Sequence, residues 1–137
     1  ASRASNLAHS QRDGFISDMV EQFRSKRPAI VRIHEAGDFY SRAYFDAWRA
    51  IAKACPDTRF FAFSKVRSIF RLVRPANFVL IFSRFPDTKG ASPKGDATFS
   101  AVPKGETGIG QRCAGGCDAC GICPFATGET HVWTEMH

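Results

Sequence analysis

Apolar residues along the chain follow two alternating patterns, one with the spacing of a helix and one that is nearly continuous. The helical spacing predicts helices at about residues 10–25, 41–55 and 66–73. The continuous runs, rich in Phe, Ile and Val, are typical of strands buried on both faces, at residues 29–34, 59–64 and 77–82. A shorter run predicts a fourth strand at residues 98–102.

This alternation of helix and strand predicts an α/β fold. Because parallel strands are joined by right-handed crossovers, we expect βαβ units with a parallel sheet or a partial barrel. With 137 residues, 44% of them hydrophobic, the chain is long enough for one sizeable core. We expect residues 1–112 to form this α/β domain, and residues 113–137 to be a C-terminal cysteine-rich metal-binding loop and tail of the same domain.

Polar residues gather where three of the predicted strands end. His34, Glu35 and Asp38 follow the first strand, Lys65 follows the second and Arg84 follows the third. Ligand sites in parallel α/β folds lie beyond the carboxyl ends of the strands, so we predict a substrate-binding role for these five residues. Because such residues also serve as ordinary strand-end caps, the sequence assigns none of them a catalytic role.

Four cysteines, Cys113, Cys117, Cys120 and Cys123, form a C-x3-C-x2-C-x2-C array followed by Pro124. So many thiols in one short loop indicate a metal site, because the alternatives are strained local disulfides or thiols without a role. Structural zinc usually takes two cysteine pairs separated by about a dozen residues or more. Ferredoxins, by contrast, bind four-iron clusters through closely spaced cysteines that end in Cys-Pro. We therefore predict an iron–sulfur cluster, of the 4Fe-4S type, with zinc as the alternative.

Other candidate ligands are less favoured. Cys55 falls on the apolar side of a predicted helix and is expected to be a buried small hydrophobe. The first three cysteines of the array have the spacing of radical S-adenosylmethionine enzymes, but Cys123 would fill the iron that those enzymes keep open. His131 and His137 lie in what we expect to be a polar tail, where no ligation is predicted.

The charge balance bears on the partners of the protein. The formal net charge of +6 suits an anionic partner, so nucleic acid is a candidate. Its candidate contacts are basic residues of the predicted third helix and the later loops: Arg67, Arg71, Arg74, Lys89, Lys94 and Lys104. No run of about twenty apolar residues and no secretory signal occurs, so we expect a soluble cytoplasmic protein with no membrane partner.

A family resemblance lies in the segment Val31-Arg-Ile-His-Glu-Ala-Gly-Asp-Phe-Tyr-Ser-Arg-Ala-Tyr-Phe-Asp-Ala-Trp48 and in Phe60-Phe-Ala-Phe-Ser-Lys65. There, and in the general layout of the later cysteine-rich segment, the sequence resembles the phage and plasmid "gene product 88" family, from about Phe15 to Cys123. Members of that family typically carry a further cysteine-rich segment upstream. The resemblance implies a barrel-like fold with cluster-binding ends. It also implies that the chain is either a short relative or a piece of a longer protein.

Three functions compete. The first is a metal-binding, iron–sulfur protein of a phage or plasmid, with the cluster in an electron-transfer or structural role. The second is a zinc-stabilised nucleic-acid-binding module. The third is an enzyme with an active site at the strand ends.

Overall fold

In a computed structural model of the chain, residues 3–34, 37–116 and 120–136 are described. The helices are α1 (Arg3–Ser10), α2 (Phe15–Lys26), α3 (Arg42–Ala54) and the short 3-10 helices η1 (Arg67–Arg71) and η2 (Cys123–Phe125). The strands are β1 (Ile30–Arg32), β2 (Arg59–Ser64), β3 (Phe78–Arg84), β4 (Ala97–Val102), β5 (Gln111–Arg112) and β6 (His131–Glu135). None of the helices in these ranges combines the length and apolarity needed to cross a bilayer.

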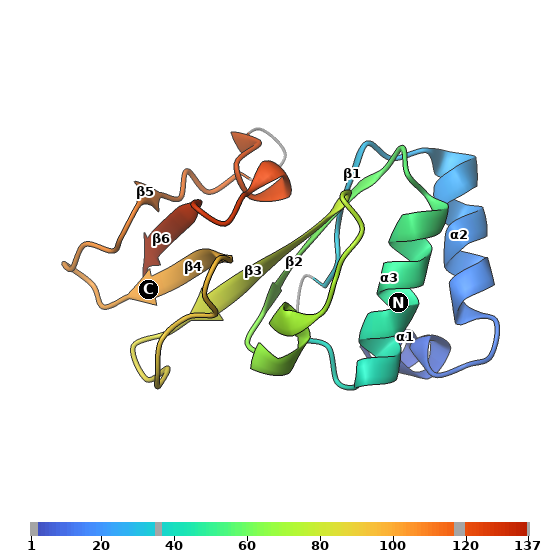
Figure 1. The fold of residues 1–137 in the computed structure, drawn as a ribbon, viewed down its shortest axis with the longest axis horizontal. Helices are drawn as coiled ribbons and strands as arrows, with labels where there is room; N and C mark the ends of the chain where they lie inside the picture. The colour runs from blue at the N-terminus through green and yellow to red at the C-terminus, as the bar shows by residue number, and fades with distance from the viewer. Residues whose placement is uncertain (1–2, 35–36, 117–119, 137) are drawn as a thin grey trace.

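The strands form a single six-stranded sheet in the order β1-β2-β3-β4-β6-β5. Every neighbouring pair is parallel. The sheet stays open, with β1 and β5 at its two edges, and has the form of a half-barrel (Figure 1). This arrangement confirms the predicted α/β fold with a parallel sheet or partial barrel.

One face of the sheet is covered by helices. In α3, Phe45, Trp48 and Ile51 are buried at helical spacing and pack against residues of β2 and β3 such as Phe60 and Leu80. Ser41 caps this helix, because its hydroxyl accepts a hydrogen bond from the backbone N–H of Tyr44 at 3.1 Å. Helix α2 lies beside α3 on the same side of the sheet (Figure 1).

The opposite face is covered by the chain that joins β5 to β6. Residues of that connection, Ile122, Cys123 and Ala126, pack against Phe61 of β2 and Ile81 of β3. From β1 to β4 each strand is added on the same side of its predecessor, whereas the step from β5 to β6 runs backwards. A right-handed connection that reverses direction must pass over the other face of the sheet, which explains why the cysteine loop is separated from the helices.

Three elements differ from the sequence-based expectation. Helix α1 and strands β5 and β6 were not predicted, and β6 lies inside the segment expected to be a polar tail. His131 begins β6, and its Nδ1 is 2.8 Å from the Thr98 hydroxyl of β4, so it belongs to the sheet and not to a polar tail. The strand escaped prediction because it is only five residues long and its two buried residues, Val132 and Trp133, are adjacent rather than alternating.

The pairing of β5 with β6 requires a close approach at Gly110. Its φ is +87°, and a Cβ there would overlap the carbonyl oxygen of His131. Gly105 has the same φ of +87° but open space around it. We expect Gly105→Ala to lower the free energy of unfolding by about 1–2 kcal/mol, the cost of the left-handed conformation alone. Gly110→Ala should lower it clearly more, as measured by urea denaturation. Equal effects would contradict the β5–β6 pairing.

Candidate functional site

The carboxyl ends of β1 and β2 are tied together by Asp38. Its Oδ1 accepts hydrogen bonds from the Ser64 hydroxyl at 2.6 Å and from the Phe39 backbone N–H at 2.7 Å. Its Oδ2 accepts a hydrogen bond from the Lys65 backbone N–H at 2.8 Å. Asp38 thus acts as a cap at the rim formed by the carboxyl ends of the strands, the ordinary role that the sequence also allowed for it. The carboxylate fixes the loop between β1 and α3 against the end of β2.

His34 and Tyr44 form a second link at the same rim. His34 has a positive φ of 64°, which turns the chain away from β1. Its Nε2 lies 2.6 Å from the Tyr44 hydroxyl, and the two rings stack with centroids 5.4 Å apart. The edge of Phe39 also packs on the imidazole, at a centroid distance of 4.9 Å. The imidazole is therefore held on two sides by aromatic rings.

Burial shifts the ionisation of both groups. Burial lowers the pKa of His34 below its ordinary value of 6.5, although the nearby Asp38 carboxylate opposes the shift. Burial also raises the pKa of Tyr44. The indole N–H of Trp48 opposes that rise but does not meet hydrogen-bonding geometry. At neutral pH the pair is an uncharged imidazole and an uncharged phenol, and the tautomer of His34 decides which of the two donates the hydrogen bond.

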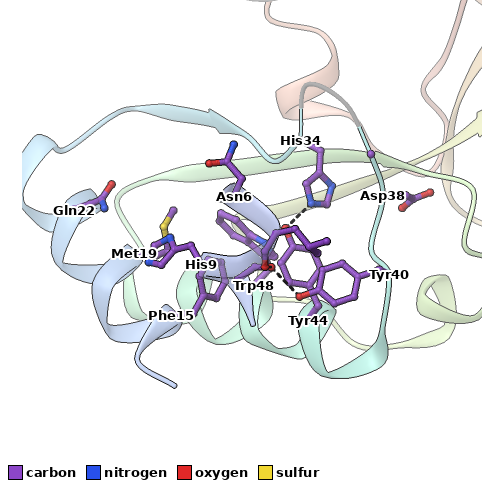
Figure 2. Close-up of a pocket in the computed structure, with 13 residues that line it drawn as sticks. Asn6, His9, Phe15, Met19, Gln22, His34, Asp38, Tyr40, Tyr44 and Trp48 are labelled. Atoms are coloured by element: carbon purple, nitrogen blue, oxygen red, sulfur yellow. Dashed lines mark hydrogen bonds between the residues drawn. The ribbon is translucent and has the colours of Figure 1, made fainter. Parts of the chain in front are cut away.

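These residues form part of the wall of an open pocket of about 1160 Å³ (Figure 2). The pocket lies among α1, α2, α3 and the loop after β1. Its wall is aromatic and polar: Asn6, Leu7, His9, Ser10, Phe15, Met19, Gln22, His34, Gly37, Asp38, Tyr40, Tyr44 and Trp48. The sequence analysis identified His34 and Asp38 but missed the three aromatic residues beside them. The available signal was their spacing, because Tyr40, Tyr44 and Trp48 recur every four residues.

The other predicted substrate-binding residues do not line this pocket. Lys65 meets Asp38 through its backbone, and its Nζ lies 4.0 Å from the centre of the Phe85 ring. The guanidinium of Arg84 donates to the carbonyl oxygen of Gly90 at 2.8 Å, within the loop that follows β3. Glu35 lies outside the described residues. The structure thus brings together two of the five residues, with Lys65 as an indirect neighbour.

A second cavity, of about 280 Å³, lies on the face of the sheet opposite to the helices. Three cysteines of the array line it: Cys113, Cys120 and Cys123. Phe63 and Phe99 form much of its apolar wall, and Arg32 and Ser83 contribute polar groups. Three of the cysteines that the sequence grouped by their spacing therefore share one cavity.

The cysteines of this cavity do not form a ready-made ligand set. Within the described ranges, no group of three or more His, Cys, Asp or Glu side chains is arranged to hold a metal ion. Cys117, the remaining cysteine of the array, lies outside those ranges. Cys55 is buried at the end of α3, and burial raises the pKa of its thiol, so its predicted role as a core residue is confirmed.

The sequence profile of the Gene product 88 family matches residues 1–109. The chain belongs to this family. The match covers most of the chain and includes every element from α1 to β4, whereas β5 and β6 of the same sheet lie beyond it. It ends before Cys113, however. Membership of the Gene product 88 family therefore carries no information on the cysteine array or on an iron–sulfur cluster.

Two relatives of this Gene product 88 chain come from mycobacteriophages. The Gene 88 protein of Mycobacterium phage L5 is 31% identical over 139 residues, which cover 79% of this chain and 58% of the relative. The Gene 88 protein of Mycobacterium phage D29 is 31% identical over 80 residues, covering 53% of this chain and 33% of the relative. The matched region thus spans a little more than half of the length of the phage L5 protein and about a third of the phage D29 protein. No solved structure matches it.

The bonds of Asp38 predict that the rim of this Gene product 88 fold depends on one carboxylate. Asp38→Ala removes the acceptor of the buried Ser64 hydroxyl and of two backbone N–H groups. We expect the free energy of unfolding to fall by about 1–3 kcal/mol, the cost of leaving such groups unpaired. Urea denaturation measures the change. Asp87→Ala, in an exposed position after β3, is the control and should have little effect. A similar loss in both variants would contradict the role of Asp38.

The lowered pKa of His34 predicts a pH dependence of stability. The unfolded chain binds a proton at His34 more readily than the folded chain, so protonation favours unfolding. The contribution of His34 to the free energy of unfolding is present above pH 6.5 and is lost as the pH falls below that value. We expect His34→Asn, which tolerates a positive φ, to show a flatter dependence than the unmodified chain between about pH 7.5 and 5.5.

Denaturation at several pH values and the NMR titration of the His34 ring measure this effect. The variant His9→Asn, in α1, is the matched control, because His9 pairs with Asp18 at 3.3 Å and does not contact Tyr44. A His34 ring that titrates at or above 6.5 would contradict the burial of the neutral form.

Proposed function

We propose that the protein is a cysteine-ligated metal protein that binds an iron–sulfur cluster of the 4Fe-4S type, in an electron-transfer or structural role. The observation that supports this proposal is the shared cavity of Cys113, Cys120 and Cys123. The cysteines are close in sequence, but the cavity also places them against one face of a rigid sheet. Cys117 would supply the fourth thiolate.

The chemistry of the cavity suits such a group, although its three described cysteines are not arranged as a ligand set. Thiolates are the preferred ligands of iron–sulfur clusters and also bind zinc. The backbone of the loop is anchored close to its ligands, because the Cys113 N–H donates to Trp133 at 2.7 Å and the Cys120 N–H donates to Gly116 at 2.9 Å. The side chains between these anchors would close around the metal as it binds, since ligation supplies folding free energy to loops of this kind.

The surroundings of the thiols would affect the properties of a bound cluster. Phe63, Phe99 and Val132 present an apolar wall that limits the access of water. Arg32 brings a positive charge to the same cavity, while its guanidinium lies 4.9 Å from the centre of the Phe63 ring. Both the low polarity and the charge act on the reduction potential of a cluster, which supplies one-electron chemistry when it is bound.

A zinc-stabilised nucleic-acid-binding module is the alternative, and its support is weaker. Two of the basic residues proposed to contact nucleic acid are engaged within the protein. Arg74 forms an ion pair with Asp96 at 2.7 Å, and Arg67 donates to the carbonyl oxygens of Lys89 and Ala91. Their guanidinium groups hold the loop between β3 and β4 in place. Phosphate contacts by these side chains would require that loop to be released.

Anaerobic purification followed by metal analysis and visible spectroscopy tests the proposal. We expect iron and sulfide in similar amounts and the broad visible absorption of a cluster, because zinc is colourless. Replacement of Cys113, Cys117, Cys120 or Cys123 by Ser should each remove most of the bound metal. Cys55→Ser is the matched control and should leave the metal content unchanged, since Cys55 is buried beside α3.

Three outcomes would contradict the proposal. Zinc at one equivalent without iron would favour the alternative centre. Protein that binds no metal after anaerobic reconstitution with iron and sulfide would exclude both, and loss of metal only in Cys55→Ser would place the site elsewhere.

A further inference from the structure

The pocket of Figure 2 is separate from the cysteine cavity. It lies on the helix side of the sheet, whereas Cys113, Cys120 and Cys123 lie on the opposite side, and the two walls share no residue. The pocket also lies within the segment that matches the Gene product 88 family, whereas the cysteines do not. Whatever the pocket binds is therefore independent of the metal proposed above.

The charge of the pocket wall restricts the ligand. The chain has 19 Lys and Arg residues, yet none whose side chain the structure describes lines this pocket. Among the described residues, the wall contains one carboxylate, Asp38, and both of its oxygens already accept hydrogen bonds from the protein. His34 is held between aromatic rings as a neutral imidazole. The described residues of this wall thus offer no cation to offset the desolvation of a phosphate, so the wall favours an uncharged ligand.

The aromatic residues of the wall provide a flat surface. Tyr40 stacks on Tyr44 with ring centroids 4.4 Å apart and an interplanar angle of 17°. Tyr44 is held in turn by its 2.6 Å hydrogen bond to His34. Tyr40 is still 48% exposed at the mouth of the pocket. A rigid, exposed ring of this kind stacks well on a planar ligand.

Two carboxamides line other parts of the same pocket. Asn6 of α1 and Gln22 of α2 line the pocket and have exposed side chains (Figure 2). A carboxamide offers a donor and an acceptor side by side, which matches the paired donor and acceptor edge of a heteroaromatic amide or amidine. Aromatic stacking supplies affinity, and the carboxamide of Asn6 would select the edge of the ring.

From these features we propose that the pocket binds an uncharged planar heteroaromatic ring of the nucleobase class, stacked on Tyr40 and contacted at its edge by Asn6. The phosphates of a nucleotide are not part of the recognition. The ring belongs to a free base or nucleoside, or to a base turned out of a single strand, whose phosphates remain outside the pocket.

Calorimetry and protein NMR with adenosine and uridine test this assignment. We expect at least one nucleoside to bind and to shift the signals of Tyr40 and Trp48. The corresponding 5′-monophosphate should bind no more tightly. Tyr40→Leu should weaken binding by about fivefold or more, the effect of losing one base–aromatic stack. Tyr40→Phe keeps the ring and should bind within about twofold of the unmodified protein.

Three results would overturn the proposal. These are the absence of nucleoside binding at millimolar concentration, tighter binding of the monophosphate, and unchanged affinity in a folded Tyr40→Leu variant. A single-stranded oligonucleotide separates the two sources of the base, because only a base presented by a strand gains affinity from neighbouring nucleotides. Cys113→Ser should bind nucleoside normally, so failure of the metal proposal leaves this test intact. Loss of nucleoside binding in Cys113→Ser would overturn the assignment to the helix side.

Discussion

Parallel strand pairing is the constraint on which the rest of this structure depends. Two neighbouring parallel strands can be joined only by chain that crosses a face of the sheet, and the crossing is right-handed. From β1 to β4 that rule places α3 and η1 on one face. The reversed step from β5 to β6 places the cysteine loop on the other face. The two candidate sites are therefore separated by the sheet itself.

The parallel arrangement also brings polar groups together at the rim of the sheet, where the strands end. Strands that run in parallel end at the same edge, so the chain after β1 lies beside the chain after β2. Asp38 uses this proximity to accept hydrogen bonds from Ser64 and Lys65. The loop that it fixes carries Tyr40 and leads into α3 at Ser41. The aromatic pocket thus has a rigid wall because a carboxylate at its edge is fully bonded.

The sequence specified the central elements well because their patterns are strong. The apolar runs at Phe60–Phe63 and Val79–Phe82 fall within β2 and β3, and the helix capped by Ser41 is present. In contrast, β6 is short, and only two adjacent residues of it, Val132 and Trp133, are apolar and buried. Its place between β4 and β5 depends on pairing between residues more than thirty positions apart, as between Thr98 and His131. Neither propensity nor local periodicity encodes such a pairing.

The candidate sites were predicted to different extents for the same reason. The spacing of Cys113, Cys120 and Cys123 is local, and these residues share a cavity as expected. The contact of His34 with Tyr44 depends on the positive φ of His34, and Lys65 acts at the rim through its backbone. Both features depend on the backbone conformation of the loops, which the identity of the side chains does not predict. Arg84 does lie at the end of β3, but its guanidinium donates a hydrogen bond to the following loop and does not line the pocket.

The position of β6 has a consequence for the folding of the chain during its synthesis on the ribosome. A chain made from its amino end delivers β4 and β5 before the strand that must lie between them. Until His131–Glu135 emerges, β4 has an unpaired edge, and β5 still lacks its neighbour in the finished sheet. Open edges of this kind recruit other chains. The five residues of β6 cover the open edge of β4 and give β5 its neighbour in the sheet.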